Sequence, residues 1–312
     1  MDNEIKNQYV LIGGTGRSGT NITRHILSNH SQVASFPFEY RFIIDPDGII
    51  DFYNSFSTTW SPFNSDVKIK RLNNFLLNLA NKNAGDKNYA EWELAEWLPN
   101  YVENVEELIS SLKSFEYSGF WPGARSDSNQ YSIWFSENFS KQQLCNVLGK
   151  FVKKNIDQYL IEKRKDIFVE DNTWNILFLR EILDLIPEVK FLHIIRDPRD
   201  VIASFINQRW CPNSIQEAII MYKSIINRYF NIENSIPQNC IKLVKLEDLV
   251  ANSEQVAREI CEFIQIPFEP SMTKVNLTRS NQGRWKNDFS IQDIQLLEDS
   301  LNSLILKLGY ET

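Results

Sequence analysis

The sequence predicts a three-layer α/β protein, in which a parallel sheet carries a P-loop-like phosphate-binding turn and a helical segment is inserted into the chain. Three observations support this fold class. Short apolar runs typical of buried strands recur along the 312 residues, amphipathic helical patterns separate most of them, and the first strand leads through a glycine-rich turn into a helix. Alternating strands and helices imply a parallel sheet that is covered by helices on both faces.

The expected strands share a run of apolar residues between polar or turn-forming ones. They span 9–14, 32–36, 166–170, 190–196 and 240–247. The expected helices have apolar residues at three- and four-residue spacing. They span 20–29, 174–185, 199–207, 215–230 and 253–264. Ligands of such sheets bind beyond the carboxyl ends of the strands, and we therefore expect the functional residues at that edge.

The alternation stops between about residues 51 and 165, where the chain becomes mostly helical and aromatic. Five of the eight tryptophans fall in this segment: Trp60, Trp92, Trp97, Trp121 and Trp134. Aromatic side chains dominate the buried area of cores, so one interpretation is a helical subdomain with a small core of its own. We predict a single domain over residues 1–312 with this segment as an insertion.

Charge and composition exclude several classes of protein. The net charge of −7 argues against a general binder of nucleic acids or anionic membranes, because both need a basic surface. The acidic, polar N-terminus is no secretory signal and no apolar run approaches a membrane span, which predicts a cytoplasmic location. The cysteines are Cys145, Cys211, Cys240 and Cys261. Their wide spacing suggests no zinc or redox motif, and we expect buried, reduced thiols.

The stretch YVLIGGTGRSGTNITRHILSNH, residues 9–30, allows three interpretations. Gly14, Gly16 and Gly19 form the G-x-G-x-x-G of dinucleotide-binding proteins, and Glu39 lies about twenty residues further on, as that fingerprint requires. The nucleotide-triphosphate P-loop shares the outer glycines, but the Thr-Asn pair at 20–21 stands where its lysine and hydroxyl belong.

The third interpretation places a cation inside the turn, as Arg17. The remaining donors of this loop are Gly16, Ser18, Gly19, Thr20 and Asn21. Backbone amides and polar side chains at a helix N-terminus suit a highly charged anion next to a bond that is to be broken. A turn between strand and helix also needs small residues merely to turn, but the arginine has no packing purpose there.

The stretch FLHIIRDPRDVIASF follows the same pattern. A buried strand ends at Arg196, the chain turns, and Pro198 is suited to begin a helix. Ser204 lies about two helical turns on, where its hydroxyl can reach the same anion as Arg196. Alternatively, Arg196 forms a structural ion pair with Asp197 or Asp200, either of which can orient it.

A third cationic cluster precedes the expected last helix, in the stretch NQGRWKNDFS. It consists of Gly283, Arg284, Trp285 and Lys286. Two cations and an indole in one loop can hold a phosphate while stacking on a base. In a protein of negative net charge, three such clusters indicate a ligand with several phosphates.

These three motifs, in this order, resemble the sulfotransferases that use 3'-phosphoadenosine 5'-phosphosulfate (PAPS). The resemblance implies that the first loop binds the 5'-phosphosulfate, that Arg196 and Ser204 bind the 3'-phosphate, and that Gly283 to Lys286 close over the nucleotide. It also implies adenosine 3',5'-bisphosphate (PAP) as product and no metal. The motif R-S-G-T around Arg17 is similar to tyrosylprotein sulfotransferases and their bacterial relatives.

The resemblance extends to FPFEYRF, where a Glu-x-Arg motif supplies the general base of the tyrosylprotein-type enzymes. Glu39 and Arg41 match it, which makes Glu39 the candidate base and Arg41 a candidate substrate-binding residue. Arg17 is then the group that stabilises charge on the leaving phosphate. The three histidines, His25, His30 and His193, are weaker candidates for the base.

Two departures from the family pattern are visible. The lysine usual before the helix that follows the third strand is replaced, with Glu170, Asp171 and Asn172 around its place. The tyrosine that often contacts adenine is replaced by Leu246. Neither departure touches the three phosphate motifs.

The implied reaction moves a sulfuryl group to a hydroxyl or amine of a small molecule, a glycan or a peptide. Part of the aromatic insertion can cover that acceptor. The acidic run at 91–108 favours a cationic acceptor; alternatively, this run is only the solvated face of a helix. The alternatives are a nucleotide-triphosphate kinase and a nucleotide-binding protein without turnover. No signal for an oligomeric state is present.

Overall fold

The computed structural model describes residues 7–39, 41–81, 93–122, 130–277 and 281–311. The chain forms two compact units. The sheet unit comprises residues 1–39, 166–180 and 188–312, and the helical unit comprises 40–165 and 181–187. Tyr40 and Trp92, which belong to predicted motifs, lie outside the described residues. The single-domain organisation stays a prediction.

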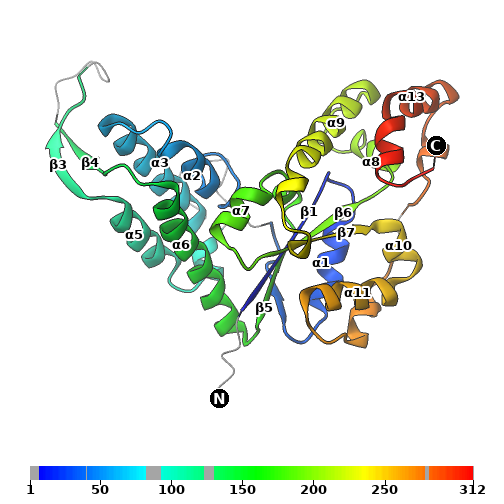
Figure 1. Cartoon of the computed structure of the whole chain (residues 1–312), viewed down its shortest axis with the longest axis horizontal. Coiled ribbons are helices and arrows are strands. Elements are labelled where there is room, and N and C mark those ends of the chain that lie inside the picture. The colour runs from blue at the N-terminus through cyan, green and yellow to red at the C-terminus, as the bar shows by residue number, and fades with distance from the viewer. Residues whose placement is uncertain (1–6, 40, 82–92, 123–129, 278–280, 312) are drawn as a thin grey trace. The chain divides into compact units, whose positions relative to one another are not determined.

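A five-stranded parallel sheet organises the sheet unit, in the order β2-β5-β1-β6-β7 (Figure 1). The strands are β1 (Gln8–Gly14), β2 (Val33–Ser35), β5 (Ile167–Glu170), β6 (Lys190–Ile195) and β7 (Ile241–Lys245). All five predicted strands are confirmed, except that the last one ends at Lys245 because a helix begins at Leu246. The fold class predicted from the sequence is therefore confirmed.

The helices of this unit connect the strands and complete the C-terminal part. They are α1 (Thr20–Ser28), α8 (Pro198–Phe205), α9 (Ile215–Ile232), α10 (Leu246–Ala251), α11 (Ser253–Ile264), α12 (Trp285–Asp288) and α13 (Ile291–Lys307). Short 3-10 segments are η1 (Thr173–Leu177), η2 (Glu233–Ser235), η3 (Gln238–Cys240) and η4 (Pro270–Lys274). The helix predicted over 174–185 is wrong as one piece: η1 ends before Phe178, and α7 (Leu179–Leu185) follows.

The core of the sheet unit follows from the alternation of side chains along each strand. Val10 and Ile12 of β1 belong to a buried cluster that includes Ile26 of α1 and Ile260 of α11. On β6, His193 points to the α9 side, where its ring centroid lies 4.0 Å from that of Tyr229. Because both faces are covered, the carboxyl edge of the sheet is the part left to bind a ligand.

The helical unit contains α2 (Ile49–Phe56), α3 (Pro62–Ala80), α4 (Leu94–Trp97), α5 (Tyr101–Leu112) and α6 (Lys141–Lys163). The sequence analysis missed an antiparallel hairpin within it, formed by β3 (Phe115–Gly119) and β4 (Tyr131–Phe135). The unit has its own aromatic core, in which Phe42 packs against Tyr101 and Phe151. The four described tryptophans of the segment are only half-buried, so phenylalanine and aliphatic residues supply most of this core.

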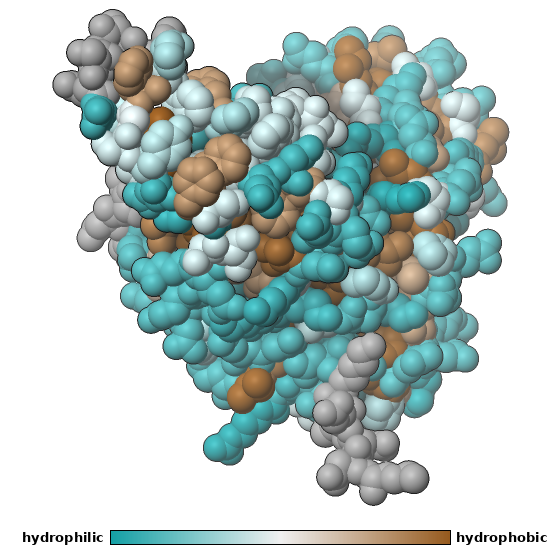
Figure 2. Space-filling view, turned by 60° about the vertical axis from the view of Figure 1, so that its left-hand side comes forward, coloured by the Kyte–Doolittle hydropathy of each residue, from teal (hydrophilic) through white to brown (hydrophobic). Residues whose placement is uncertain are grey.

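One face of the molecule is largely polar (Figure 2). Figure 2 shows a face on which hydrophilic residues predominate and hydrophobic side chains form small, separate groups. Within the described ranges, no helix is both long enough and apolar enough to cross a membrane.

Candidate functional site

The loop between β1 and α1 has a backbone that only a glycine-rich sequence adopts easily. Gly16, Arg17 and Gly19 have positive φ angles of 85°, 55° and 106°. Gly19 is also required by space, because a Cβ atom there would lie 2.7 Å from Leu246 Cδ1. A Cβ atom on Gly14 would lie 2.1 Å from Ser18 Oγ. The glycines therefore fold the loop tightly between the strand and the helix.

This conformation leaves hydrogen-bond donors available. The backbone amides of residues 16–19 donate to no carbonyl oxygen among the described residues. Successive amides in alternating conformations form an anion-binding concavity, and the N-terminus of α1 adds its dipole. Ser18 Oγ is also buried, with the residue 0% exposed, and has no hydrogen-bond partner in the described structure. Such donors are suited to an anionic group, and their binding of a phosphosulfate stays a prediction.

Arg17 and Ser204 meet at this loop. Arg17 Nε donates to Ser204 Oγ over 2.9 Å, although 187 positions separate the two residues. Arg17 is exposed, whereas Ser204 is buried on α8. Pro198 and the Asp197 side chain, which accepts from the Arg199 amide over 2.9 Å, begin that helix.

Arg196 lies at the end of β6 and contacts the same loop. Its Nη1 donates to the Arg17 carbonyl over 3.3 Å, and its Nη2 donates to the Asn281 carbonyl over 2.9 Å. Nη2 also lies 3.6 Å from Asp200 Oδ2. Burial lowers the pKa of this guanidinium, and the charge of Asp200 counteracts the decrease. The ion pair weighed as an alternative therefore exists, with Asp200 as the partner, and the same geometry places Arg196 at the anion-binding loop.

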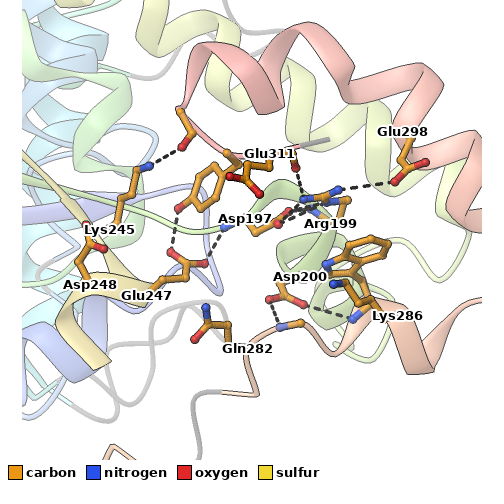
Figure 3. Close-up of a pocket in the computed structure, with 14 residues that line it drawn as sticks. Asp197, Arg199, Asp200, Lys245, Glu247, Asp248, Gln282, Lys286, Glu298 and Glu311 are labelled. Atoms are coloured by element: carbon orange, nitrogen blue, oxygen red, sulfur yellow. Dashed lines mark hydrogen bonds and ion pairs between the residues drawn. The ribbon is translucent and has the colours of Figure 1, made fainter. Parts of the chain in front are cut away.

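The C-terminal loop is attached to the start of α8. The amides of Gly283 and Trp285 donate to the Asp200 carboxylate over 2.7 and 3.2 Å (Figure 3). The buried Trp285 ring lies 4.2 Å from the guanidinium carbon of Arg199. The end of this segment forms the one-turn helix α12, so the predicted loop is partly helical.

The two cations of this loop point to different partners. Arg284 donates to Asp288 over 2.6 Å, and the exposed Lys286 lies with Nζ 5.4 Å from the centroid of the Trp285 ring. A cavity of about 530 Å³ opens beside the loop. Charged side chains from α8, α10 and α13 line it together with Trp285 and Tyr310 (Figure 3).

The acidic turn after β5 is held by α1. Asp171 is buried and lies 2.9 Å from Arg24 Nε, and Asn21 Nδ2 donates to it over 3.3 Å. Arg24 also donates to the Phe36 carbonyl over 3.3 Å. The sequence analysis missed Arg24, although its spacing of three from Asn21 places the two on one helix face. A cation thus lies beside the position where the family lysine is absent.

Glu39 and Arg41 follow β2. Glu39 is half-buried and lies four residues beyond the end of that strand. Arg41 belongs to the helical unit, where its Nε lies 2.7 Å from Asp45 Oδ2. Burial raises the pKa of the Asp45 carboxyl, and the hydrogen bond from Arg41 counteracts the increase. The roles of Glu39 and Arg41 stay predictions.

Two further expectations from the sequence concern Leu246, at the place of the adenine-contacting tyrosine, and the burial of the cysteines. Leu246 is buried under Gly19, so it serves loop packing. Of the four free thiols, only Cys261 is buried, and the prediction of burial is wrong for the three others, which are half-buried. Among the described residues, no three His, Cys, Asp or Glu side chains are grouped so that they can hold a metal ion.

The fold is that of an α/β protein with a glycine-rich turn at the carboxyl edge of a parallel sheet. Residues 9–270 match the model of the sulfotransferase family. Because this match spans most of the chain, the protein belongs to the sulfotransferase family. The match is to the family at large and does not single out the tyrosylprotein enzymes. No curated protein sequence matches the chain.

Solved structures that are similar to this chain include two sulfotransferase domains. The sulfotransferase domain of the olefin synthase from Synechococcus PCC 7002 is 14% identical, with a TM-score of 0.50 over 100% of this chain and 98% of that one. The domain from the curacin biosynthetic pathway is 15% identical, with a TM-score of 0.49 and 98% of both chains covered. Mouse sulfotransferase SULT7A1, which was crystallised with PAP, is 9% identical, with a TM-score of 0.44 over 98% and 85%.

Proposed function

We propose that this protein transfers the sulfuryl group of PAPS to a hydroxyl or amine of a small-molecule, glycan or peptide acceptor. The observation that carries the proposal is the meeting of three elements at one loop. Arg17 donates to Ser204, and Arg196 donates to the Arg17 carbonyl. The amides of residues 16–19 in the same loop donate to no carbonyl oxygen within the described part of the chain. This arrangement suits a nucleotide with phosphate groups at both the 5' and 3' positions.

Arg17 and the loop amides serve the reacting end of the nucleotide. PAPS supplies a sulfuryl group whose bond to the bridging phosphate oxygen breaks while a bond to the acceptor forms. Negative charge then grows on that bridging oxygen. Arg17 is exposed and can turn toward it, and fixed amide donors stabilise such charge more in the transition state than in the ground state.

Arg196 and Ser204 serve the 3'-phosphate. Arg196 and Ser204 each form a hydrogen bond with Arg17, Arg196 with its carbonyl and Ser204 with its side chain. One phosphate can therefore bridge the side chains of Arg196 and Ser204. Arginine is well suited to this task because its planar fork donates two parallel hydrogen bonds. Gly283, Arg284, Trp285 and Lys286 then cover the nucleotide from the C-terminal loop.

Glu39 accepts the proton of the acceptor, and Arg41 binds the acceptor. This part of the proposal rests on the Glu-x-Arg motif and its likeness to the tyrosylprotein-type enzymes. The position of Glu39 beyond β2, at the carboxyl edge of the sheet, supports it. The carboxylate must come within hydrogen-bond reach of the acceptor for this role.

Incubation with PAPS and a panel of metabolites, glycans and peptides tests the proposal, with mass spectrometry as the readout. We expect one acceptor class to gain a sulfuryl group while an equal amount of PAP appears. PAPS that stays intact with every acceptor, while ATP phosphorylates one of them, would establish the kinase alternative instead. Tight binding of PAP without any turnover would support the other alternative, a nucleotide-binding protein that catalyses no reaction.

A further inference from the structure

Asp200 is a buried carboxylate on the functional side of the sheet unit. It is the third residue of α8 and is 1% exposed. A carboxylate taken out of water needs hydrogen-bond donors or a cation, because burial without them is costly. The start of a helix provides a favourable dipole, but the hydrogen-bond donors for Asp200 come from another part of the chain.

The donors come from the C-terminal loop, about eighty residues away in the sequence. Gly283 donates its amide to Oδ2 over 2.7 Å, and Trp285 donates its amide to Oδ1 over 3.2 Å. Each carboxylate oxygen thus holds one backbone group of the loop (Figure 3). Oδ2 also lies 3.6 Å from Arg196 Nη2.

Arg196 holds the same loop from its other end. Its Nη2 donates to the Asn281 carbonyl over 2.9 Å, while Asp200 binds the amides two and four residues further on. The Trp285 ring in turn lies against Arg199, the residue before Asp200. The path of residues 281–285 and the orientation of Arg196 are therefore determined by one connected set of bonds.

We propose that Asp200 is a positioning residue. It couples the closed path of the C-terminal loop to the orientation of Arg196 toward the 3'-phosphate, so that the two form one cooperative arrangement. The inference rests on the proposed function, which supplies the 3'-phosphate. Asp200 does not bind this phosphate itself, because two anions repel each other. It acts through Arg196 and through the amides of Gly283 and Trp285.

The first test is Asp200→Asn, with Asp248→Asn as the matched control. Asp248 is an exposed carboxylate of α10 that lines the same cavity, so its replacement removes the same charge without touching the loop amides. In Asp200→Asn, one loop amide faces an NH₂ group, and PAP affinity should fall about tenfold or more. AMP affinity should fall less, because AMP loses the cover of the loop but has no 3'-phosphate for Arg196 to bind. The exchange of the Gly283 and Trp285 amides, measured by hydrogen exchange, should accelerate. Asp248→Asn should alter neither quantity.

A second variant changes the loop and leaves the buried carboxylate in place. Gly283 has a φ of 72°, and a Cβ atom there would meet nothing within 4 Å, so Gly283→Ala adds backbone strain without a clash. We expect a roughly fivefold to tenfold loss of PAP affinity and a smaller loss of AMP affinity. Gly309→Ala serves as control, because it places similar backbone strain at φ 74° in another turn, where the new Cβ atom lies 3.1 Å from Lys245 Nζ, the end of a flexible side chain.

The outcomes separate the inference from the proposed function. Selective loss of PAP affinity together with faster loop exchange supports the positioning role of Asp200. Equal loss of PAP and AMP affinity, or no loss in either variant, overturns it and leaves Asp200 as a residue of the fold. If the unchanged protein does not bind PAP, the proposed function itself fails, and the inference fails with it.

Discussion

The Arg17 guanidinium donates to the Ser204 hydroxyl over 2.9 Å and so joins the turn after β1 to the helix after β6. These two residues come from separate motifs, which the resemblance to PAPS-dependent sulfotransferases links to different phosphates of one nucleotide. Their contact brings the two predicted phosphate-binding elements together. It also makes Arg17 the residue whose replacement best separates catalysis from binding.

Arg17→Ala should lower turnover far more than it weakens PAP binding. Removing a donor to a developing charge typically costs on the order of a hundredfold or more in rate. PAP lacks the reacting sulfuryl group, so its affinity should fall much less than the rate does. Single-turnover assays and calorimetric titration of the same preparation measure both quantities. Wild-type turnover in the variant would rule out the role of Arg17.

Arg196→Ala should weaken PAP and spare AMP. A charge-assisted contact to the 3'-phosphate is worth roughly 1.5–3 kcal/mol, and AMP has no such phosphate. Arg258→Ala is a suitable control, because Arg258 is an exposed cation of α11 that pairs with Glu254. Equal weakening of PAP and AMP would show that Arg196 only supports the fold.

Glu39→Gln should retain nucleotide affinity and lose rate. The amide has nearly the shape of the carboxyl but accepts no proton, so turnover should fall by about a hundredfold or more. The loss should be smaller for activated phenols than for alkyl alcohols, because an acidic hydroxyl needs less help in losing its proton. A small loss that does not depend on acceptor acidity would mean that another residue is the base.

The burial of His193 predicts that the free energy of unfolding depends on pH, whatever the function of the protein. Complete burial lowers the pKa of this side chain to about 3 from 6.5. Between these two values the unfolded chain binds more protons than the folded one, so the free energy of unfolding falls as the pH drops below about 6.5. The contribution is at most about 1.4 kcal/mol per pH unit.

His193→Leu should remove this contribution. Neither ring nitrogen of His193 has a hydrogen-bond partner in the described structure, so leucine breaks no bond there. Urea unfolding at a series of pH values should give a flatter curve below about pH 6.5 for the variant than for the parent protein. An unchanged slope would show that His193 is not the group that titrates.

The strands were predictable because their signals are local. The runs that form β1 and β6 are apolar enough to be recognised in isolation, and the rule for parallel sheets places Arg17 and Arg196 at the same edge. The hairpin of β3 and β4 was not predicted, because its aromatic residues fit a helical core equally well and strand pairing is not local.

Contacts between distant residues could not be derived from spacing. The sequence suggests Asp200 as a partner of Arg196 but gives no sign that it holds the amides of Gly283 and Trp285. The ion pair between Arg24 and Asp171 likewise depends on how α1 lies against the end of β5. Such contacts are set by tertiary packing, which single-sequence patterns do not contain.

Calorimetric titration of the unchanged protein with PAP, ATP and NAD tests the central claim most directly. Only PAP offers one phosphate to the loop after β1 and a second to Arg196, so it should bind at least about tenfold more tightly than either competitor. Binding of ATP or NAD as tightly as PAP would contradict the assignment of this site to PAPS.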